Sequence, residues 1–183
     1  YYSVTGNSEG QAGFTDVTND DDPTQNVIVW NNQLYLFTTK AVYAIYQAND
    51  PNVVINPAFP VPLFVGTPIT GAPGTNAPFS IVSTPQGIIY QSNEQGLFLM
   101  NGYTAMPIAP QILNIMRGET VEGYTMGTVI AASYGRLEYV FSDGTKSLAY
   151  NVMDGAVRSL GVPLTAIYFE PDTNQFSASN ATF

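Results

Sequence analysis

Short runs of apolar, β-branched and aromatic residues follow one another along most of this chain, separated by Asn, Gly, Pro and Asp. Each run has the length of a strand and each gap the length of a hairpin turn, so the pattern predicts antiparallel β-structure. The predicted strands cover residues 26–30, 33–37, 41–46, 79–83, 87–91, 97–100, 103–108, 128–133, 136–141, 146–151, 156–160, 166–169 and 174–178. The predicted turns are centred on residues 31–32, 85–86, 101–102, 134–135, 143–144 and 154–155.

The predicted strands fall into a repeat. Leu34, Ile88 and Leu137 mark the second strand of successive units, and they recur at intervals of about 50 residues, near the period of a four-stranded propeller blade. The sequence therefore predicts an all-β, β-propeller-like fold with about four repeats of four antiparallel strands. We expect a single domain over residues 1–183. A β-sandwich with irregular strand pairs is the alternative architecture.

The last unit shows only its first two strands, and the start of the chain offers the other two. Residues 2–6 and 13–17 resemble third and fourth strands. Residues 1–25 would then complete the last blade with residues 164–183, and the closed ring would leave no unpaired sheet edge. The alternative is that the chain, which opens without Met, is a fragment of a larger propeller.

Two segments depart from the strand pattern. Residues 110–117 predict one short helix, because Pro110 suits a first turn and Gly118 can end the helix. Residues 57–78 are rich in Pro and Gly and predict a loop around a short strand at 63–65.

Composition removes several kinds of chemistry. The chain has no Cys and no His, which excludes disulfides, thiolate nucleophiles, Cys/His zinc sites and every Ser-His or Cys-His pair. Only 10% of the residues are charged, and the net charge is −9. A free-standing nucleic-acid-binding protein normally has the opposite sign.

Carboxylates are the remaining candidates for catalysis or metal binding. Glu138, Asp143, Asp154 and Glu170 could form the acid pair of a propeller glycosidase. The structural interpretation is favoured, because Asp143 and Asp154 each precede Gly in a predicted turn. The acidic run at residues 19–22 could hold a hard cation, but a solvated loop is the preferred interpretation. We expect no catalytic residues, no metal and no cofactor.

Other motifs point away from phosphate binding and from membranes. Residues 66–74 contain no Gly-rich phosphate loop. No apolar run is long enough to span a bilayer, and no signal peptide is visible, so we expect no membrane insertion. A glycosylation triplet at 180–182 is too short to be specific. The basic residues are scattered along the chain, at Lys40, Arg117, Arg136, Lys146 and Arg158.

Three segments together resemble the propeller-type tail proteins of bacteriophages, the hub, nozzle and DNA-stabilisation proteins of short-tailed phages. The first is the strand pair of residues 29–37 and 41–45. The second runs from Ala77-Pro78-Phe79-Ser80 through residues 87–90 to the closing Asn101-Gly102. The third is the helix at 110–117, where Ile108-Ala109 replaces the family's Ile-Ser.

The resemblance covers residues 26–160 and implies a structural virion protein rather than an enzyme. It implies a homo-oligomeric ring in the phage tail, with neighbouring tail or portal proteins as partners. DNA would pass nearby without specific binding. A low content of Lys and Arg would suit a channel wall that does not hold the passing phosphates.

Two other functions remain open from the sequence. A carbohydrate- or receptor-binding propeller would need aromatic side chains at loop tips, and Tyr103, Tyr124 and Tyr134 lie near predicted turns. An acid-pair hydrolase would need two of the four carboxylates named above to share a pocket.

Overall fold

The computed structural model describes residues 21–48, 63–93 and 96–179. The strands predicted at 2–6 and 13–17 lie outside the described residues, as does the glycosylation triplet. Thr24 and Gln25 belong to the first strand of the structure. The completion of the last blade by residues 1–25 stays a prediction.

Antiparallel sheets make up nearly all of the described structure, which confirms the all-β prediction. Each sheet is built from consecutive strands in chain order. The first sheet consists of β1 (Thr24–Trp30), β2 (Gln33–Thr38), β3 (Ala41–Ala48) and β4 (Leu63–Pro73). The second consists of β5 (Val82–Thr84), β6 (Gly87–Ser92), β7 (Gly96–Met100) and β8 (Ala105–Ile108). The third consists of β9 (Ala131–Gly135), β10 (Glu138–Ser142), β11 (Ser147–Asn151) and β12 (Val157–Ser159). The C-terminal hairpin consists of β13 (Ala166–Glu170) and β14 (Gln175–Ser179).

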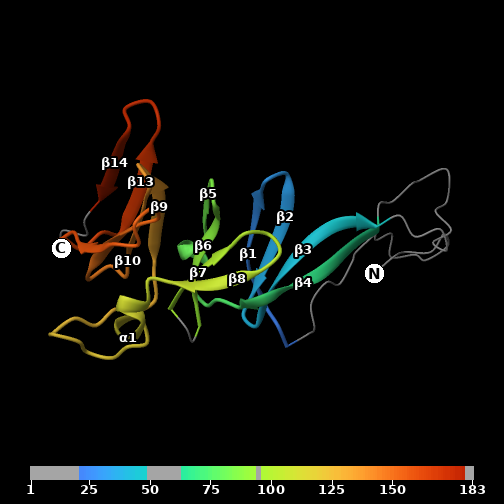
Figure 1. Ribbon diagram of the computed structural model, residues 1–183, viewed down its shortest axis with the longest axis horizontal. Coiled ribbons are helices and arrows are strands. Elements are labelled where there is room, and N and C mark those ends of the chain that lie inside the picture. The colour runs from blue at the N-terminus through green and yellow to red at the C-terminus, as the bar shows by residue number, and fades with distance from the viewer. Residues whose placement is uncertain (1–20, 49–62, 94–95, 180–183) are drawn as a thin grey trace, which may run out of the picture.

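The sheets stand in a row in chain order (Figure 1). Each sheet packs on the next through an apolar cluster, so there are three junctions. The first sheet lies at one end of the row and the C-terminal hairpin at the other. The row is open, and the described residues form no closed ring.

Aromatic side chains fill the first two junctions. Between the first and second sheets, the ring centroids of Phe37 and Tyr90 are 5.0 Å apart in an edge-to-face arrangement. Between the second and third sheets, Tyr139 and Phe141 stack with centroids 5.1 Å apart. In the third junction, between the third sheet and the hairpin, the buried side chains are smaller, such as Val140, and Phe176 of the hairpin packs against them.

The two inner sheets are covered on both faces. In β6 every residue is buried, with Ile88 facing the first junction and Ile89 facing the second. In β10 Tyr139 faces the second junction while Val140 faces the third. This is the side-chain alternation of a strand, applied to a sheet that has a core on each side.

Two predicted hairpin turns are confirmed with different geometries. Asn31 and Asn32 are both left-handed, with φ of 49° and 61°, which is the two-residue turn that matches strand twist. Asn101 closes the β7–β8 turn through its side chain. Its Oδ1 accepts hydrogen bonds from the backbone N–H groups of Tyr103 and Thr104, each at 3.1 Å.

The turn predicted at residues 134–135 is wrong by two residues. Gly135 ends β9 and pairs with Glu138, and the turn is formed by Arg136 and Leu137, both left-handed with φ of 52° and 66°. Leu137 therefore precedes the second strand of its unit instead of lying in it. Gly135 serves packing, because a Cβ at this position would overlap the ring of Phe169.

The loop predicted around a short strand at 63–65 is also wrong, because β4 continues to Pro73. β4 is an edge strand, where a residue without an N–H is tolerated. Its pairing with β3 is irregular, since Tyr43 lies opposite Pro68 while Ala41 lies opposite Pro73. The part of the predicted loop before Leu63 lies outside the described residues.

The strand predicted at 79–83 is wrong in its first half. Residues 78–80 form a 3₁₀ helix, η1 (Pro78–Ser80), and β5 begins at Val82. The Oγ of Ser80 donates to the carbonyl of Ala77 at 2.7 Å and stabilises the turn. β8 and β9 likewise begin two and three residues later than predicted, at Ala105 and Ala131.

The short helix predicted near 110–117 is confirmed. A 3₁₀ turn, η2 (Pro110–Ile112), leads into α1 (Leu113–Met116). Ile112 and Met116 are buried in the second junction, and the N–H of Gly118 donates to the carbonyl of Ile115 at 3.1 Å. No helix in the described part of the chain is long and apolar enough to cross a membrane.

Candidate functional site

The four candidate carboxylates belong to separate local structures. Glu138 begins β10 and forms an ion pair with Arg158 at 2.7 Å. Asp143 and Asp154 accept hydrogen bonds from backbone N–H groups of their own turns, as their position before Gly indicates. Glu170 ends β13 and accepts a hydrogen bond from a nearby threonine hydroxyl. Within the described residues, no hydrogen bond or ion pair joins any two of the four.

Asp143 has the most fully bonded of these carboxylates. Oδ1 accepts from the N–H groups of Thr145 and Lys146, and Oδ2 from the N–H of Gly127, all at 2.8 Å. Partial burial acts to raise the pKa of Asp143, but the hydrogen bonds prevail and lower it. The carboxylate is therefore ionised at neutral pH and fixes the loop before β9 to the β10–β11 turn.

Residues 19 and 20 of the acidic run lie outside the described residues, and Asp22 of the same run is an anchor. Asp22 is buried, and its carboxylate accepts from the hydroxyls of Thr38 and Thr39 at 2.7 and 2.9 Å and from the N–H of Lys40 at 2.9 Å. The prediction of a solvated loop is wrong for this residue, because Asp22 holds the β2–β3 turn. Among the described residues, no group of three acidic side chains is placed to hold a metal ion.

The three candidate tyrosines differ in exposure. Tyr103 is 86% exposed at the β7–β8 turn. Tyr124 is half-buried, with the Nζ of Lys146 4.2 Å from its ring centroid. Tyr134 is half-buried on β9, and burial raises the pKa of its hydroxyl despite a hydrogen bond with Gln86. Only Tyr103 of the three presents its ring to solvent.

The basic residues form no stripe. Lys146 and Arg158 bind Gly123 O and Glu138 respectively, and Arg117 follows α1. Lys40 lies in the β2–β3 turn of the first sheet and Arg136 in the β9–β10 turn of the third. Counterion release by so dispersed a set would give weak affinity for nucleic acid.

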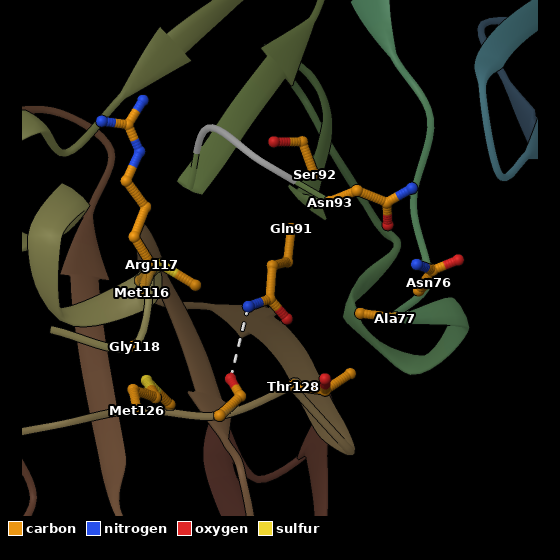
Figure 2. Close-up of a pocket in the computed structure, with 11 residues that line it drawn as sticks. Asn76, Ala77, Gln91, Ser92, Asn93, Met116, Arg117, Gly118, Met126 and Thr128 are labelled. Atoms are coloured by element: carbon orange, nitrogen blue, oxygen red, sulfur yellow. Dashed lines mark hydrogen bonds between the residues drawn. The ribbon is translucent and has the colours of Figure 1, made fainter.

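A polar hollow of about 260 Å³ is lined by the end of β6, the end of α1, the segment before η1 and the segment that leads into β9 (Figure 2). Asn76, Asn93, Arg117 and Thr128 line it, and Gln91 stands at its centre. Gln91 donates through Nε2 to the carbonyl of Gly127 at 3.3 Å, and its Oε1 accepts from a backbone N–H at 2.7 Å. Its amide therefore ties the end of β6 to the segment that leads into β9.

Among the described residues, no apolar cluster covers the second face of the first sheet. Strand pairing aligns two rows of residues across β1–β4, and the alternate residues, such as Tyr35 and Phe37, fill the first junction. Val27, Val29 and Leu34 are 48%, 61% and 36% exposed. We call this surface the open face. Its rows are Val27, Leu36, Tyr43 and Pro68, and Val29, Leu34, Ile45 and Gly66.

The open face belongs to a sheet without charge. The four strands β1–β4 contain no Asp, Glu, Lys or Arg. The strands of the second sheet also contain none, and that sheet is covered on both faces. A solvated face of an antiparallel sheet normally carries polar residues, and exposed edges normally carry charge. The first sheet thus has the composition of a covered sheet. Exposure is greatest on β1 and falls toward β3, where Ile45 is buried.

Sequence reasoning missed the buried polar groups that link the strands to their turns. Phe37-Thr38 and Phe141-Ser142 end the second strands of two units, and all four side chains are fully buried. The Ser142 hydroxyl donates to the carbonyl of Lys146 at 2.9 Å, as the Thr38 hydroxyl binds Asp22. Phe before a hydroxyl residue is not a specific signal, because Phe79-Ser80 has the same pattern and Phe79 is 68% exposed.

Comparison with known proteins adds no relative. No protein-family model matches the chain, and a search of curated proteins finds no significant match. The resemblance to phage tail proteins therefore stays a prediction.

Proposed function

We propose that the chain is a structural protein of a bacteriophage tail, in a homo-oligomeric ring beside other tail or portal proteins, and that it is not an enzyme. The observation that carries the proposal is the row of sheets joined by apolar junctions. Such a row forms a continuous wall from repeated units, as an assembly component requires. The fold alone does not define the function, so the proposal also rests on the sequence resemblance.

We further propose that the sheets are propeller blades, three complete and the last represented by its first two strands. The first strand of each unit is a sheet edge, and β1 contacts β5, β5 contacts β9, and β9 contacts β13. Trp30 Nε1 donates to the carbonyl of Thr84 at 2.7 Å across one of these contacts. Aligned first strands are the arrangement expected around a propeller axis. Further strands from residues 1–20 or from a longer chain would complete the set of blades and close the propeller within one chain.

Charge supports a role as a channel wall. The chain has 14 acidic and 5 basic residues. A wall of this composition repels passing phosphates and releases few counterions, so DNA would move past it without being held.

The mass of the full chain in solution tests the proposal. Light scattering behind a sizing column is expected to give a defined ring mass of six or twelve copies. A ring would direct the next experiment to its channel, where replacing acidic residues by Lys should slow DNA ejection. A chain that stays monomeric or dimeric at every concentration would contradict the ring.

Glycan or receptor binding is the second candidate, and the exposed ring of Tyr103 favours it. Aromatic rings exposed at loop tips stack on apolar sugar faces. Binding to a glycan array that is lost in Tyr103→Ala, and kept in Tyr168→Ala, would support this candidate. Tyr168 is a suitable control because it is also exposed but lies on β13.

A further inference from the structure

We propose that Asn101 is a site of self-modification, at which the side-chain amide becomes a carboxylate after attack by the backbone nitrogen of Gly102. Asn101 lies in the exposed turn between β7 and β8, and it is the one asparagine of the chain that is followed by glycine. Glycine has no Cβ to hinder the attack. The turn also carries the exposed ring of Tyr103, so the modification changes a surface that faces solvent.

Hydrogen bonds to the side chain of Asn101 prepare its amide for attack. Oδ1 accepts from the backbone N–H groups of Tyr103 and Thr104 at 3.1 Å each, and from the Thr104 hydroxyl at 3.4 Å. These donors face the oxygen on which negative charge develops when a nucleophile adds to the amide carbon. A side chain held in this way folds over the peptide link that it shares with Gly102, so its amide carbon stays close to the attacking nitrogen.

The nitrogen of Gly102 is available as the nucleophile. It must lose its proton before it can attack, and a hydrogen bond from that N–H to a carbonyl would oppose the loss. Within the described residues, the N–H of Gly102 donates no hydrogen bond. Because the neighbouring Asn101 is exposed, water and hydroxide reach the turn and can remove the proton.

The third sheet contains the same kind of turn without these features. Asn151 ends β11, and its Oδ1 accepts from the N–H groups of Met153 and Asp154 at 2.8 and 3.4 Å. The next residue is Val152, whose N–H donates to the carbonyl of Leu137 at 2.9 Å. This nitrogen is therefore already bonded, and it is also shielded by a β-branched side chain. We expect Asn151 to remain an amide.

The reaction needs only water. A bond forms between the Gly102 nitrogen and the Cγ of Asn101, the Cγ–Nδ2 bond breaks, and the side-chain nitrogen leaves as ammonia with the proton that the Gly102 nitrogen gives up. The product is a cyclic imide, which water opens at either of its carbonyl carbons. Opening at Cγ leaves aspartate, and opening at the main-chain carbonyl carbon leaves isoaspartate. Each event makes the net charge of −9 more negative by one.

The two products act differently on the turn. The aspartate carboxylate can still accept from the N–H groups of Tyr103 and Thr104, so the hairpin is kept and gains a charge. Isoaspartate lengthens the main chain by a methylene group and moves the carboxylate, so these hydrogen bonds are lost and the ring of Tyr103 is displaced. The modification depends neither on the proposed tail function nor on glycan binding.

The test is incubation of the folded full chain at mildly alkaline pH, followed by peptide mapping with mass spectrometry and an enzymatic assay for isoaspartate. Asn101 should convert at least about tenfold faster than Asn151, to a mixture of aspartate and isoaspartate. Asn101→Gln is the blocked variant, because glutamine would have to close a larger ring. Gly102 itself is not replaced, because a Cβ there would lie 2.7 Å from the hydroxyl oxygen of Tyr35.

A second variant separates the structure from the sequence motif. Val152→Gly places a glycine after Asn151 but leaves the N–H of residue 152 bonded to Leu137. Asn151 should still convert at least about tenfold more slowly than Asn101. Circular dichroism spectra and melting curves establish that each variant is folded. Equal rates at the two asparagines would overturn the role of the free N–H. An unchanged Asn101 in the wild type would overturn the proposal, as would aspartate without isoaspartate, because direct hydrolysis of the amide gives aspartate alone.

Discussion

The first and second sheets have nearly the same chemistry and different surroundings. Both are four-stranded antiparallel sheets whose strands contain no charged residue. The second sheet packs on a neighbour at each face, while in the described part of the chain the first packs on a neighbour at one face. The comparison teaches that uncharged strands alone do not decide coverage, because the third sheet contains Glu138 and Arg158 and is also covered on both faces.

The periodicity of the strand sequences is a separate indicator of coverage. β6 runs Ile88-Ile89-Tyr90 and β1 runs Ile28-Val29-Trp30, so neither strand alternates polar and apolar residues. Continuous apolar strands are typical of sheets buried on both faces. β6 meets that condition within the chain, and β1 meets it only if something covers the open face.

The largest expected difference between the two sheets is in the cost of removing an aliphatic side chain. Ile89→Ala empties a buried position in the second junction and should lower the free energy of unfolding by about 2–5 kcal/mol. Val29→Ala on the open face should change it by less than about 0.5 kcal/mol in a dilute sample. Urea denaturation of both variants measures the difference. Similar losses would mean that the open face is already covered in the monomer.

A smaller effect is expected at the third junction, where a glycine permits close packing. Gly135→Ala would drive a Cβ into the ring of Phe169 and should cost about 1–3 kcal/mol. The cost should fall when Phe169 is replaced by Leu, because the double substitution relieves the overlap. A denaturation cycle over the four proteins measures this coupling. Additive effects would show that the strain at Gly135 comes from its backbone.

These cases also show which parts of the fold could be predicted from the sequence. Turns governed by neighbouring residues were predictable, because Asn31 and Asn32 tolerate left-handed backbone and Asp143 binds N–H groups two and three residues ahead. The turn at Arg136 and Leu137 was not predictable. Its apparent glycine signal belongs to Gly135, whose neighbour Phe169 is distant in sequence.

The residues of the candidate site also fall into two groups, those whose role could be predicted from the sequence and those whose role could not. The structural role of Asp154 followed from its position before Gly, and it is confirmed by its hydrogen bond to the N–H of Ala156. The anchoring role of Asp22 depends on Thr38 and Lys40 across a hairpin and was missed. The open face was also missed, because the sequence shows that Val27 and Val29 are apolar but not which sheet faces have a partner.

The smallest effect concerns a buried hydroxyl in the second junction. The Tyr139 hydroxyl donates to the carbonyl of Ser80 at 2.7 Å and joins the third sheet to η1. Tyr139→Phe keeps the ring and loses this hydrogen bond, so it should lower the free energy of unfolding by about 1 kcal/mol at neutral pH. Thermal or urea denaturation at pH 7 measures it, with Tyr168→Phe as the exposed control.

At alkaline pH, Tyr139→Phe should become more stable than the wild-type protein. Burial raises the pKa of Tyr139 well above its usual value, so the folded protein keeps a proton that the unfolded chain releases above pH ~10. Stability due to the neutral hydroxyl is therefore complete below pH ~10 and is lost as pH rises further, by about 1.4 kcal/mol per pH unit. Tyr139→Phe lacks this titration, so the gap should close within about one pH unit above 10, and the variant should then be the more stable protein. A constant gap from pH 7 to 11 would mean that water reaches Tyr139, and that the second junction is no better covered than the open face.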